Sequence, residues 1–199
     1  LYLSPSVVIK RNSEIVREGG VREVRFETTD SKSLETSIPF LKANNLDYSE
    51  ILPIADPAVK KVVGVTLFIM MTVVVVMLLS NGVNLTDGVD GLASGSSAIV
   101  GVVLGILAYV SSHHDMAGYL NTMFIPGAEE LVIFAATLVG ATAGFLWYNS
   151  YPAQVFMGDT GSLALGGIIG VFAILIRKEL LLPILCGIFI AEFTSSFIQ

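Results

Sequence analysis

Charged residues are scarce in this chain, and cysteine is almost absent. Asp, Glu, Lys and Arg make up only 14% of the 199 residues, whereas soluble domains carry nearer a quarter. The single cysteine, Cys186, excludes an internal disulfide and lies in an apolar run, where we expect it to be a packing residue. With 53% hydrophobic residues and a mean hydropathy of +0.75, the composition indicates an integral membrane protein.

Basic residues are missing from the whole middle of the chain, because neither Lys nor Arg occurs between Val62 and Ile176. Outside this stretch basic and acidic residues balance, so the net charge of -6 lies within it. Acidic side chains next to lipid are costly, and they need compensation by a divalent cation such as Mg²⁺ or by basic residues from elsewhere. The six acidic residues of this stretch are Asp87, Asp90, Asp115, Glu129, Glu130 and Asp159.

Long apolar runs predict an all-α, multispanning membrane bundle over residues 59–199. Each run is close to the roughly 20 residues that a helix needs to cross a bilayer. Because the chain begins with Leu1, we expect it to be an interior piece of a longer protein. The predicted helices cover 59–80, 92–112, 129–148 and 160–177, and a fifth begins near 180.

A polar segment, residues 1–58, precedes these helices and carries most of the charge. Gly19 and Gly20 separate two β-like runs, which predicts a hairpin in an extracytoplasmic segment. Residues 31–50 show no clear period, and we expect a loop with a short helix there.

Two acidic, glycine-bearing loops adjoin the apolar runs, at residues 84–93 (NLTDGVDGLA) and 156–162 (FMGDTGS). One apolar segment leaves the first loop and a second returns to the other loop. Both loops are therefore expected to open on the same face of the membrane. This arrangement is typical of an active site.

The first loop offers several oxygen ligands. Asp87 and Asp90 would share a face if the segment were helical, and Asp90 is also placed to cap the helix that begins near Gly91. Capping explains one aspartate but hardly both. Asn84 adds a side-chain carbonyl, which is a competent ligand for a hard cation.

The second loop enters a helix at Asp159, where backbone N–H groups and the helix dipole favour a phosphate. Gly158 and Gly161 allow the backbone to approach a ligand closely. Asp159 is placed to hold Mg²⁺ against phosphate oxygens, as phosphoryl transfer requires. Phe156 is suited either to stack on a flat ring such as a nucleobase or to anchor the loop at the membrane interface.

Two blocks of this sequence resemble signatures of the bacterial phospho-N-acetylmuramoyl-pentapeptide transferases. They are residues 81–93 (NGVNLTDGVDGLA) and 144–163 (GFLWYNSYPAQVFMGDTGSL), and the resemblance extends over about residues 59–199. The related polyprenyl-phosphate sugar-1-phosphate transferases share the DG-x-DG and GD-x-G cores, but usually not the residues around them.

The resemblance implies a membrane enzyme, of which about five of the family's ten helices lie in this chain. Such an enzyme transfers phospho-MurNAc-pentapeptide from UDP-MurNAc-pentapeptide to undecaprenyl phosphate, which gives lipid I and UMP, and it requires Mg²⁺. It lies in the bacterial plasma membrane, with its active-site loops facing the cytoplasm. A homodimer in the lipid bilayer is expected, and no nucleic-acid partner.

The resemblance also assigns roles to individual residues. Asp159 would be the main Mg²⁺ ligand and Asn84 a second, while Asp87 and Asp90 would line the catalytic cleft. Phe156 would stack on uracil. Asn149, Gly158 and Gln199 match further positions that line the substrate cleft.

The chain departs from the family pattern in three places. The upstream Asp-Asp pair is absent, and residues 1–58 are longer than the usual connection. The His-rich motif is expected downstream, and His113-His114 does not substitute for it, because it lies on the face opposite the acidic loops.

Charge and family also disagree about orientation. The basic residues that flank the helices lie on the face opposite the acidic loops, which would make that face cytoplasmic, whereas the family places the acidic loops there. These basic residues are Lys60, Lys61, Arg177 and Lys178.

Three alternatives stay open at this point. A sister enzyme would use a UDP-N-acetylhexosamine donor and would differ in which donor releases UMP. A transporter or channel would place its acidic residues near mid-membrane rather than at one face. An inactive fragment would lack part of the catalytic cleft.

Overall fold

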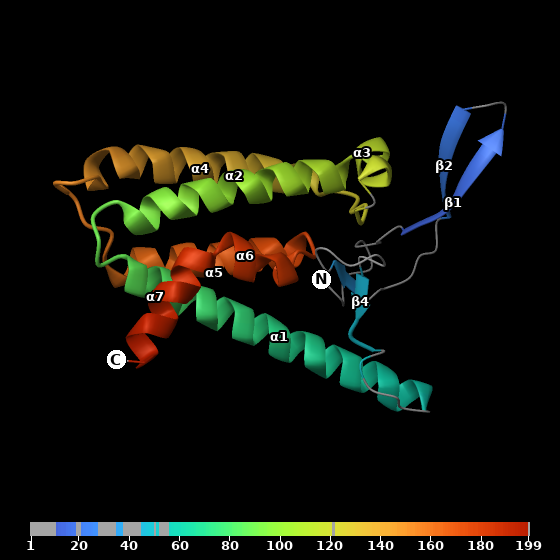
Figure 1. Ribbon diagram of the computed structural model, residues 1–199, viewed down its shortest axis with the longest axis horizontal. Helices are drawn as coiled ribbons and strands as arrows, with labels where there is room; N and C mark the ends of the chain where they lie inside the picture. Colours follow the sequence, from blue (N-terminus) through green and yellow to red (C-terminus); the bar gives the residue numbers. More distant parts are fainter. Residues whose placement is uncertain are drawn as a thin grey trace.

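The computed structural model is a helical bundle with a small β region (Figure 1). Long apolar helices account for the bundle, as the sequence predicts. Among the described helices, four are each long and apolar enough to cross a membrane, and a bent pair of shorter helices makes a fifth span. Helices α1 (Pro57–Thr86), α2 (Leu92–Ser112), α3 (His114–Tyr119), α4 (Glu129–Asn149) and α5 (Gly158–Leu175) precede η1 (Glu179–Leu181), α6 (Leu182–Leu185) and α7 (Gly187–Ile198). The structure describes residues 11–18, 21–27, 35–37, 45–49, 51, 56–120 and 122–198.

Helix α1 begins one turn earlier than the apolar run and ends later. Asp56 caps its first turn by accepting the N–H of Ala58 at 2.9 Å, and Pro57 supplies a preset helical φ. At the other end the helix continues through Asn84 to Thr86, whose hydroxyl donates to the carbonyl of Gly82 at 2.8 Å. Residues 81–86, expected outside the helix, therefore form its last turns.

The long helices pack in pairs, α2 against α4 and α1 against α5, as Figure 1 shows. Glycines make the close approach of α1 and α5 possible. A Cβ on Gly166 would overlap the backbone of Leu79 and Ser80, and a Cβ on Gly170 would meet Val76. Small residues at a crossing let backbones approach in membrane bundles, where apolar burial alone gives little drive for association.

The fifth span is broken, whereas the sequence predicts only a helix starting near residue 180. Its two parts, 179–185 and 187–196, meet at an angle of 74°. Pro183 lies in the first turn of α6, and α7 begins at Gly187. Proline and glycine occur at most sharp helix kinks. Cys186 lies at the break and is buried in the main apolar core, which confirms its role as a packing residue.

The polar N-terminal segment contains two antiparallel strand pairs. Strands β1 (Arg11–Glu18) and β2 (Val21–Glu27) pair as the predicted hairpin. Strands β3 (Glu35–Ser37) and β4 (Asn45–Asp47) also pair, so these residues are not the loop with a short helix that we expected. Local sequence signals for strands are weak here, and β3 is held by hydrogen bonds to the carbonyl of Arg177, just after α5.

A polar clasp, formed by Thr36, Ser37, Tyr48, Arg177, Lys178 and Glu179, fastens this segment to the bundle. The N–H of Ser37 and the hydroxyl of Thr36 donate to the carbonyl of Arg177, at 3.2 and 3.3 Å. Lys178 Nζ donates to Ser37 Oγ at 2.9 Å, and the Tyr48 hydroxyl donates to Glu179 Oε1 at 3.3 Å.

The clasp lies at the end of the bundle opposite the acidic loops, where Figure 1 shows β4. Its cations are not a free basic surface, because only 2% of Arg177 and 6% of Lys178 is exposed. The Arg177 guanidinium lies 4.7 Å from the centre of the Phe68 ring on α1, a cation–π contact.

Candidate active site at the acidic end of the bundle

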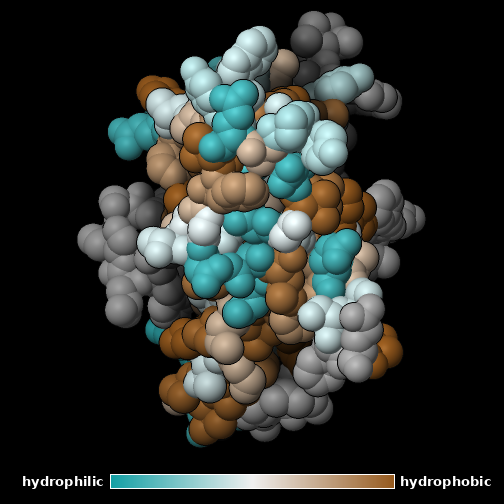
Figure 2. All heavy atoms as spheres, turned by 90° about the vertical axis from the view of Figure 1, so that its left-hand side faces the viewer, coloured by the Kyte–Doolittle hydropathy of each residue, from teal (hydrophilic) through white to brown (hydrophobic). Residues whose placement is uncertain are grey.

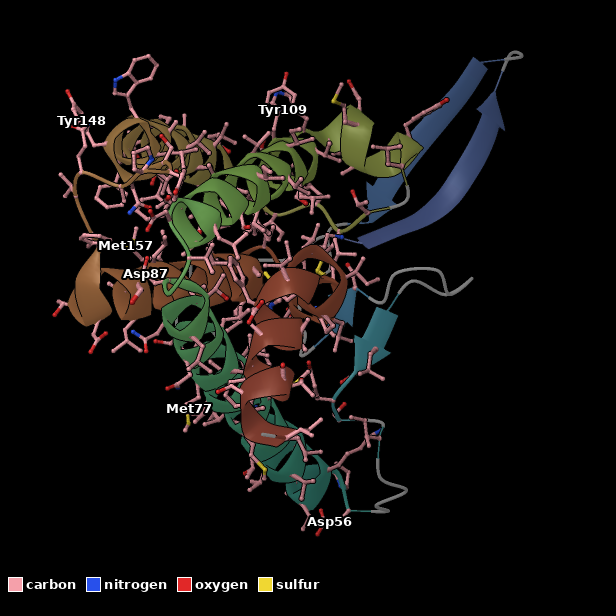
Figure 3. The ribbon with its side chains drawn as sticks, turned by 60° about the vertical axis from the view of Figure 1, so that its left-hand side comes forward. Asp56, Met77, Asp87, Tyr109, Tyr148 and Met157 are labelled. Atoms are coloured by element: carbon pink, nitrogen blue, oxygen red, sulfur yellow. The ribbon has the colours of Figure 1, made fainter. Side chains whose placement is uncertain are left out.

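Both acidic loops lie at the same end of the bundle, as predicted. Figure 3 shows Asp87, after α1, close to Met157, before α5, while Asp56 marks the far end of α1. Seen end-on in Figure 2, hydrophilic residues gather at the centre of this face, with apolar residues above and below. The topology thus brings two segments that are distant in the sequence to one polar surface.

A direct hydrogen bond connects the two segments. Asn84 Nδ2 donates to Asp159 Oδ1 at 3.2 Å and to Ser162 Oγ at 2.9 Å. Asn84 comes from the last turn of α1, whereas Asp159 and Ser162 come from the first turns of α5. Ser162 is fully buried and joins this contact, although sequence reasoning did not select it as a site residue.

Asp87 is the residue that ends α1, and it is half-buried beside this contact. Its backbone N–H donates to the carbonyl of Val83 at 3.1 Å. Burial, and then the negative charge of Asp159, raise the pKa of the Asp87 carboxyl above its ordinary value. The two carboxylates are therefore close enough to repel each other.

The donor set of this site fits Mg²⁺. Asp159 and Asp87 offer carboxylate oxygens, and the exposed Asp159 is open to a ligand. In the described part of the chain no three His, Cys, Asp or Glu side chains gather to hold a metal by themselves. Mg²⁺ is commonly held by one or two carboxylates together with substrate phosphates, so two carboxylates suffice. Asn84 presents its amide nitrogen to Asp159, and ligation by Asn84 would require the amide to turn its oxygen inward.

Asp90 does not cap α2, contrary to one possibility that the sequence left open. The residue before α2 is Gly91, which adopts a left-handed φ of 76° and makes no side-chain cap. Asp90 Oδ2 instead accepts the backbone N–H of Ala153 at 3.1 Å, in the segment that joins α4 to the second loop. A Cβ on Gly91 would lie 3.3 Å from Ser150 Cα, so the close approach of the loops also favours glycine there.

Asn149 lies beneath the loops, with 3% of its surface exposed. Its Oδ1 accepts from Gly91 N at 3.2 Å and Ser94 Oγ at 2.9 Å, and its Nδ2 donates to the Val155 carbonyl at 2.9 Å. Sequence reasoning placed Asn149 in the substrate cleft but did not select Ser94. The signal that could have indicated Ser94 is its position one helical turn after Gly91.

Phe156 and Gly158 lie on the exposed surface of the second loop. The Phe156 side chain is 72% exposed, so its ring is accessible to a ligand. Gly158 has a left-handed φ of 69°, and nothing would lie within 4 Å of a Cβ there, which makes it a conformational requirement at the start of α5. Gln199 lies outside the described residues.

The sequence of this chain is similar to those of known proteins. The model of a family described as glycosyl transferase family 4 matches residues 36–177. Relatives named phospho-N-acetylmuramoyl-pentapeptide-transferase occur in Porphyromonas gingivalis, Parabacteroides distasonis and Bacteroides thetaiotaomicron, and they are 64%, 60% and 57% identical to this chain. Each alignment covers all 199 residues of the chain and 47% of the relative, so the chain spans about half the length of these relatives.

Proposed function

We propose, starting from the fact that this chain belongs to glycosyl transferase family 4, that it forms part of a phospho-N-acetylmuramoyl-pentapeptide transferase. The donor would be UDP-MurNAc-pentapeptide and the acceptor undecaprenyl phosphate. An oxygen of the lipid phosphate forms a bond to the sugar-linked phosphorus, and the bond from that phosphorus to UMP breaks. The products are lipid I and UMP.

The observation that carries this proposal is the contact of Asn84 with Asp159 at the start of α5, beside Asp87 and the exposed Phe156. The first turn of α5 offers N–H groups and a positive dipole end for the donor phosphates. Phe156 would stack on uracil. Asp87 and Asp90 would line the same cleft, and Asp90 holds the second loop in place through Ala153.

Mg²⁺ fits this proposal as the counterion of the site. Asp159 would hold it, with Asn84 as a second ligand after its amide has turned. When bound, Mg²⁺ offsets the charge of the pyrophosphate and polarises the phosphorus under attack. The residues of this chain then mainly orient the donor, because phosphoryl transfer depends chiefly on positioning and electrostatics.

We also propose that the acidic loops face the cytoplasm, where UDP-linked donors occur. Burial of Arg177 and Lys178 in the polar clasp supports this orientation. Their charges lie within an internal contact, so they do not form an exposed basic surface of the kind that marks a cytoplasmic face. Of the four basic residues that flank the helices there, Lys60 and Lys61 still weigh against it. Exposed apolar residues along α1 and α4, such as Val62 and Ile133, are suited to contact lipid, and the homodimer stays a proposal.

The test is UMP release by the complete gene product that carries this chain, in membranes supplied with undecaprenyl phosphate and Mg²⁺. We expect UMP from UDP-MurNAc-pentapeptide and none from UDP-N-acetylglucosamine. The reverse preference would favour the sister enzyme, and cation flux without UMP would favour a transporter. The position of Asp87 and Asp159 at one end of the bundle already argues against the transporter, which predicts acidic residues near mid-membrane.

A further inference from the structure

We propose that Asn149 is a positioning residue that joins the two acidic loops into one unit, and that its bond to Ser94 thereby contributes to donor affinity through the position of the second loop. This inference rests on the proposed function for its kinetic consequence. Its structural basis is the hydrogen-bond network among Asn149, Ser94, Gly91 and Val155, which we call the loop junction.

The loop junction uses both polar atoms of the Asn149 amide. The oxygen accepts from Gly91, at the end of the first loop, and from Ser94, in the first turn of α2. The nitrogen donates to the carbonyl of Val155, directly before the second loop. One side chain thus connects three segments, and its burial keeps these bonds out of competition with water.

Other contacts hold the second loop at the same place. Gln154 N–H donates to the Tyr148 carbonyl at 2.9 Å, and Ala153 N–H donates to Asp90 at 3.1 Å. Phe156 follows Val155 directly, so its backbone position depends on the bond from Asn149 to that carbonyl. Phe156 is exposed and has little other packing to fix it. The loop junction therefore determines the position of its ring at the site where the donor would bind.

The hydrogen bond between Ser94 and Asn149 joins α2 to α4, whereas Thr142, a buried polar residue further along α4, bonds within its own helix. Further along the helices the contact depends on small and apolar residues, such as Gly101 against Val139 and Gly105 against Ala135. Helix packing alone therefore needs no buried asparagine. The network lies where the two loops meet, which points to a role in orienting them.

The chain offers a closely matched pair of variants for the test. Ser94 and Ser97 are both fully buried on α2, but only Ser94 bonds to Asn149, and within the described residues the Ser97 hydroxyl has no hydrogen-bond partner. Ser94→Ala removes one bond of the loop junction and leaves Asn149 in place. Ser97→Ala removes the same atom without breaking a bond.

In the complete gene product we expect Ser94→Ala to raise the KM for UDP-MurNAc-pentapeptide about three- to tenfold, the range expected for loss of one buried hydrogen bond. We expect kcat to change less, because Asp159 is held from α1 by Asn84 rather than through this network. Ser97→Ala should match the wild type. Asn149→Ala should raise KM by about tenfold or more, and adding Ser94→Ala should then have no further effect, because the two residues act through one network.

A readout without turnover separates this inference from the proposed function. Amide hydrogen exchange at residues 153–155 should be faster in Ser94→Ala than in Ser97→Ala or the wild type. If wild-type protein releases no UMP from the donor, the proposed function is wrong, while the exchange data still decide whether the junction orders the loop. Equal exchange and equal KM in the two serine variants would overturn the inference.

Discussion

The side-chain amide of Asn84 donates to the carboxylate of Asp159 at 3.2 Å, across 75 positions of the sequence. This contact depends on the close packing of α1 against α5, since each helix contributes one partner from its end. Ser80 Oγ on α1 reinforces the pairing by donating to the Leu163 carbonyl on α5 at 2.8 Å. The geometry of the acidic site is therefore a consequence of helix spacing as well as of loop sequence.

Gly166→Ala should move the two helices apart and damage the site. The added Cβ would overlap the backbone of Leu79 and Ser80, and overpacking of this kind typically costs about 1–3 kcal/mol. We expect a lower thermal unfolding temperature in detergent together with reduced UMP release. The adjacent Gly167 has nothing within 4 Å of a Cβ, so Gly167→Ala is the matched control and should leave both quantities unchanged or improved. Equal behaviour of the two variants would show that close packing at Gly166 does not set the site.

Phe156→Ala should weaken donor binding while leaving the protein folded. Stacking of a base on an aromatic ring contributes about 1–3 kcal/mol, which corresponds to a rise in donor Kd of roughly five- to 150-fold. Competition binding with UMP measures this without turnover. Trp147→Ala removes another exposed aromatic residue near the same end and should leave the affinity unchanged, whereas Phe156→Tyr should retain it. An unaltered affinity in Phe156→Ala would return this residue to the role of an interface anchor.

The sequence predicted most of the helical bundle, because apolar runs of membrane length leave few alternatives to helices. It also predicted that Asp87 and Asp159 share one end, because two spans separate them. It did not show that Asn84 belongs to α1. The end of that helix depends on Thr86 bonding back to Gly82 and on Asp87 closing the last turn, and these are choices of local geometry that no apolar pattern encodes.

Tyr48→Phe should destabilise the polar clasp at the opposite end. The substitution removes the hydroxyl that donates to Glu179 and leaves a buried carboxylate oxygen without that donor, at a cost of about 1–3 kcal/mol. The edge-to-face contact of the ring with Phe68 would be retained, so packing changes little. Tyr119→Phe, at a fully exposed tyrosine, is the control for chemical denaturation. A wild-type midpoint for Tyr48→Phe would mean that the clasp contributes nothing to stability.

Stability should also rise with pH at the alkaline side of neutrality because of Lys178. Burial lowers the pKa of Lys178 to about 8 from its ordinary 10.5. Between these values the unfolded chain binds more protons than the folded one, so raising the pH favours the folded state. Burial raises the pKa of Tyr48, which opposes this trend only near pH 10 and above. The slope of the unfolding temperature against pH between about pH 8 and pH 10 should therefore be more positive in the wild type than in Lys178→Met. A similar slope in both proteins would contradict this role of Lys178.

The clasp and the loop junction were beyond sequence reasoning for a common physical reason. Each is stabilised by tertiary hydrogen bonds between segments far apart in the chain, and a motif that contains one partner, such as Asn149, does not name the other. Ser37 meets Lys178 across 141 positions, and Ser94 meets Asn149 across 55. Local pattern determines which segments become helices, but the partner of a buried serine becomes visible only when the helices have been packed.

The most direct test of the proposed function is Mg²⁺-dependent UMP release from UDP-MurNAc-pentapeptide by membranes containing the complete gene product, compared with its Asp159→Asn variant. We expect release by the wild type, which falls by at least about a hundredfold in the variant because a principal cation ligand is lost. Asp115→Asn, at an exposed residue on α3, should behave as the wild type. Normal, Mg²⁺-dependent UMP release by Asp159→Asn would contradict the assignment of this site.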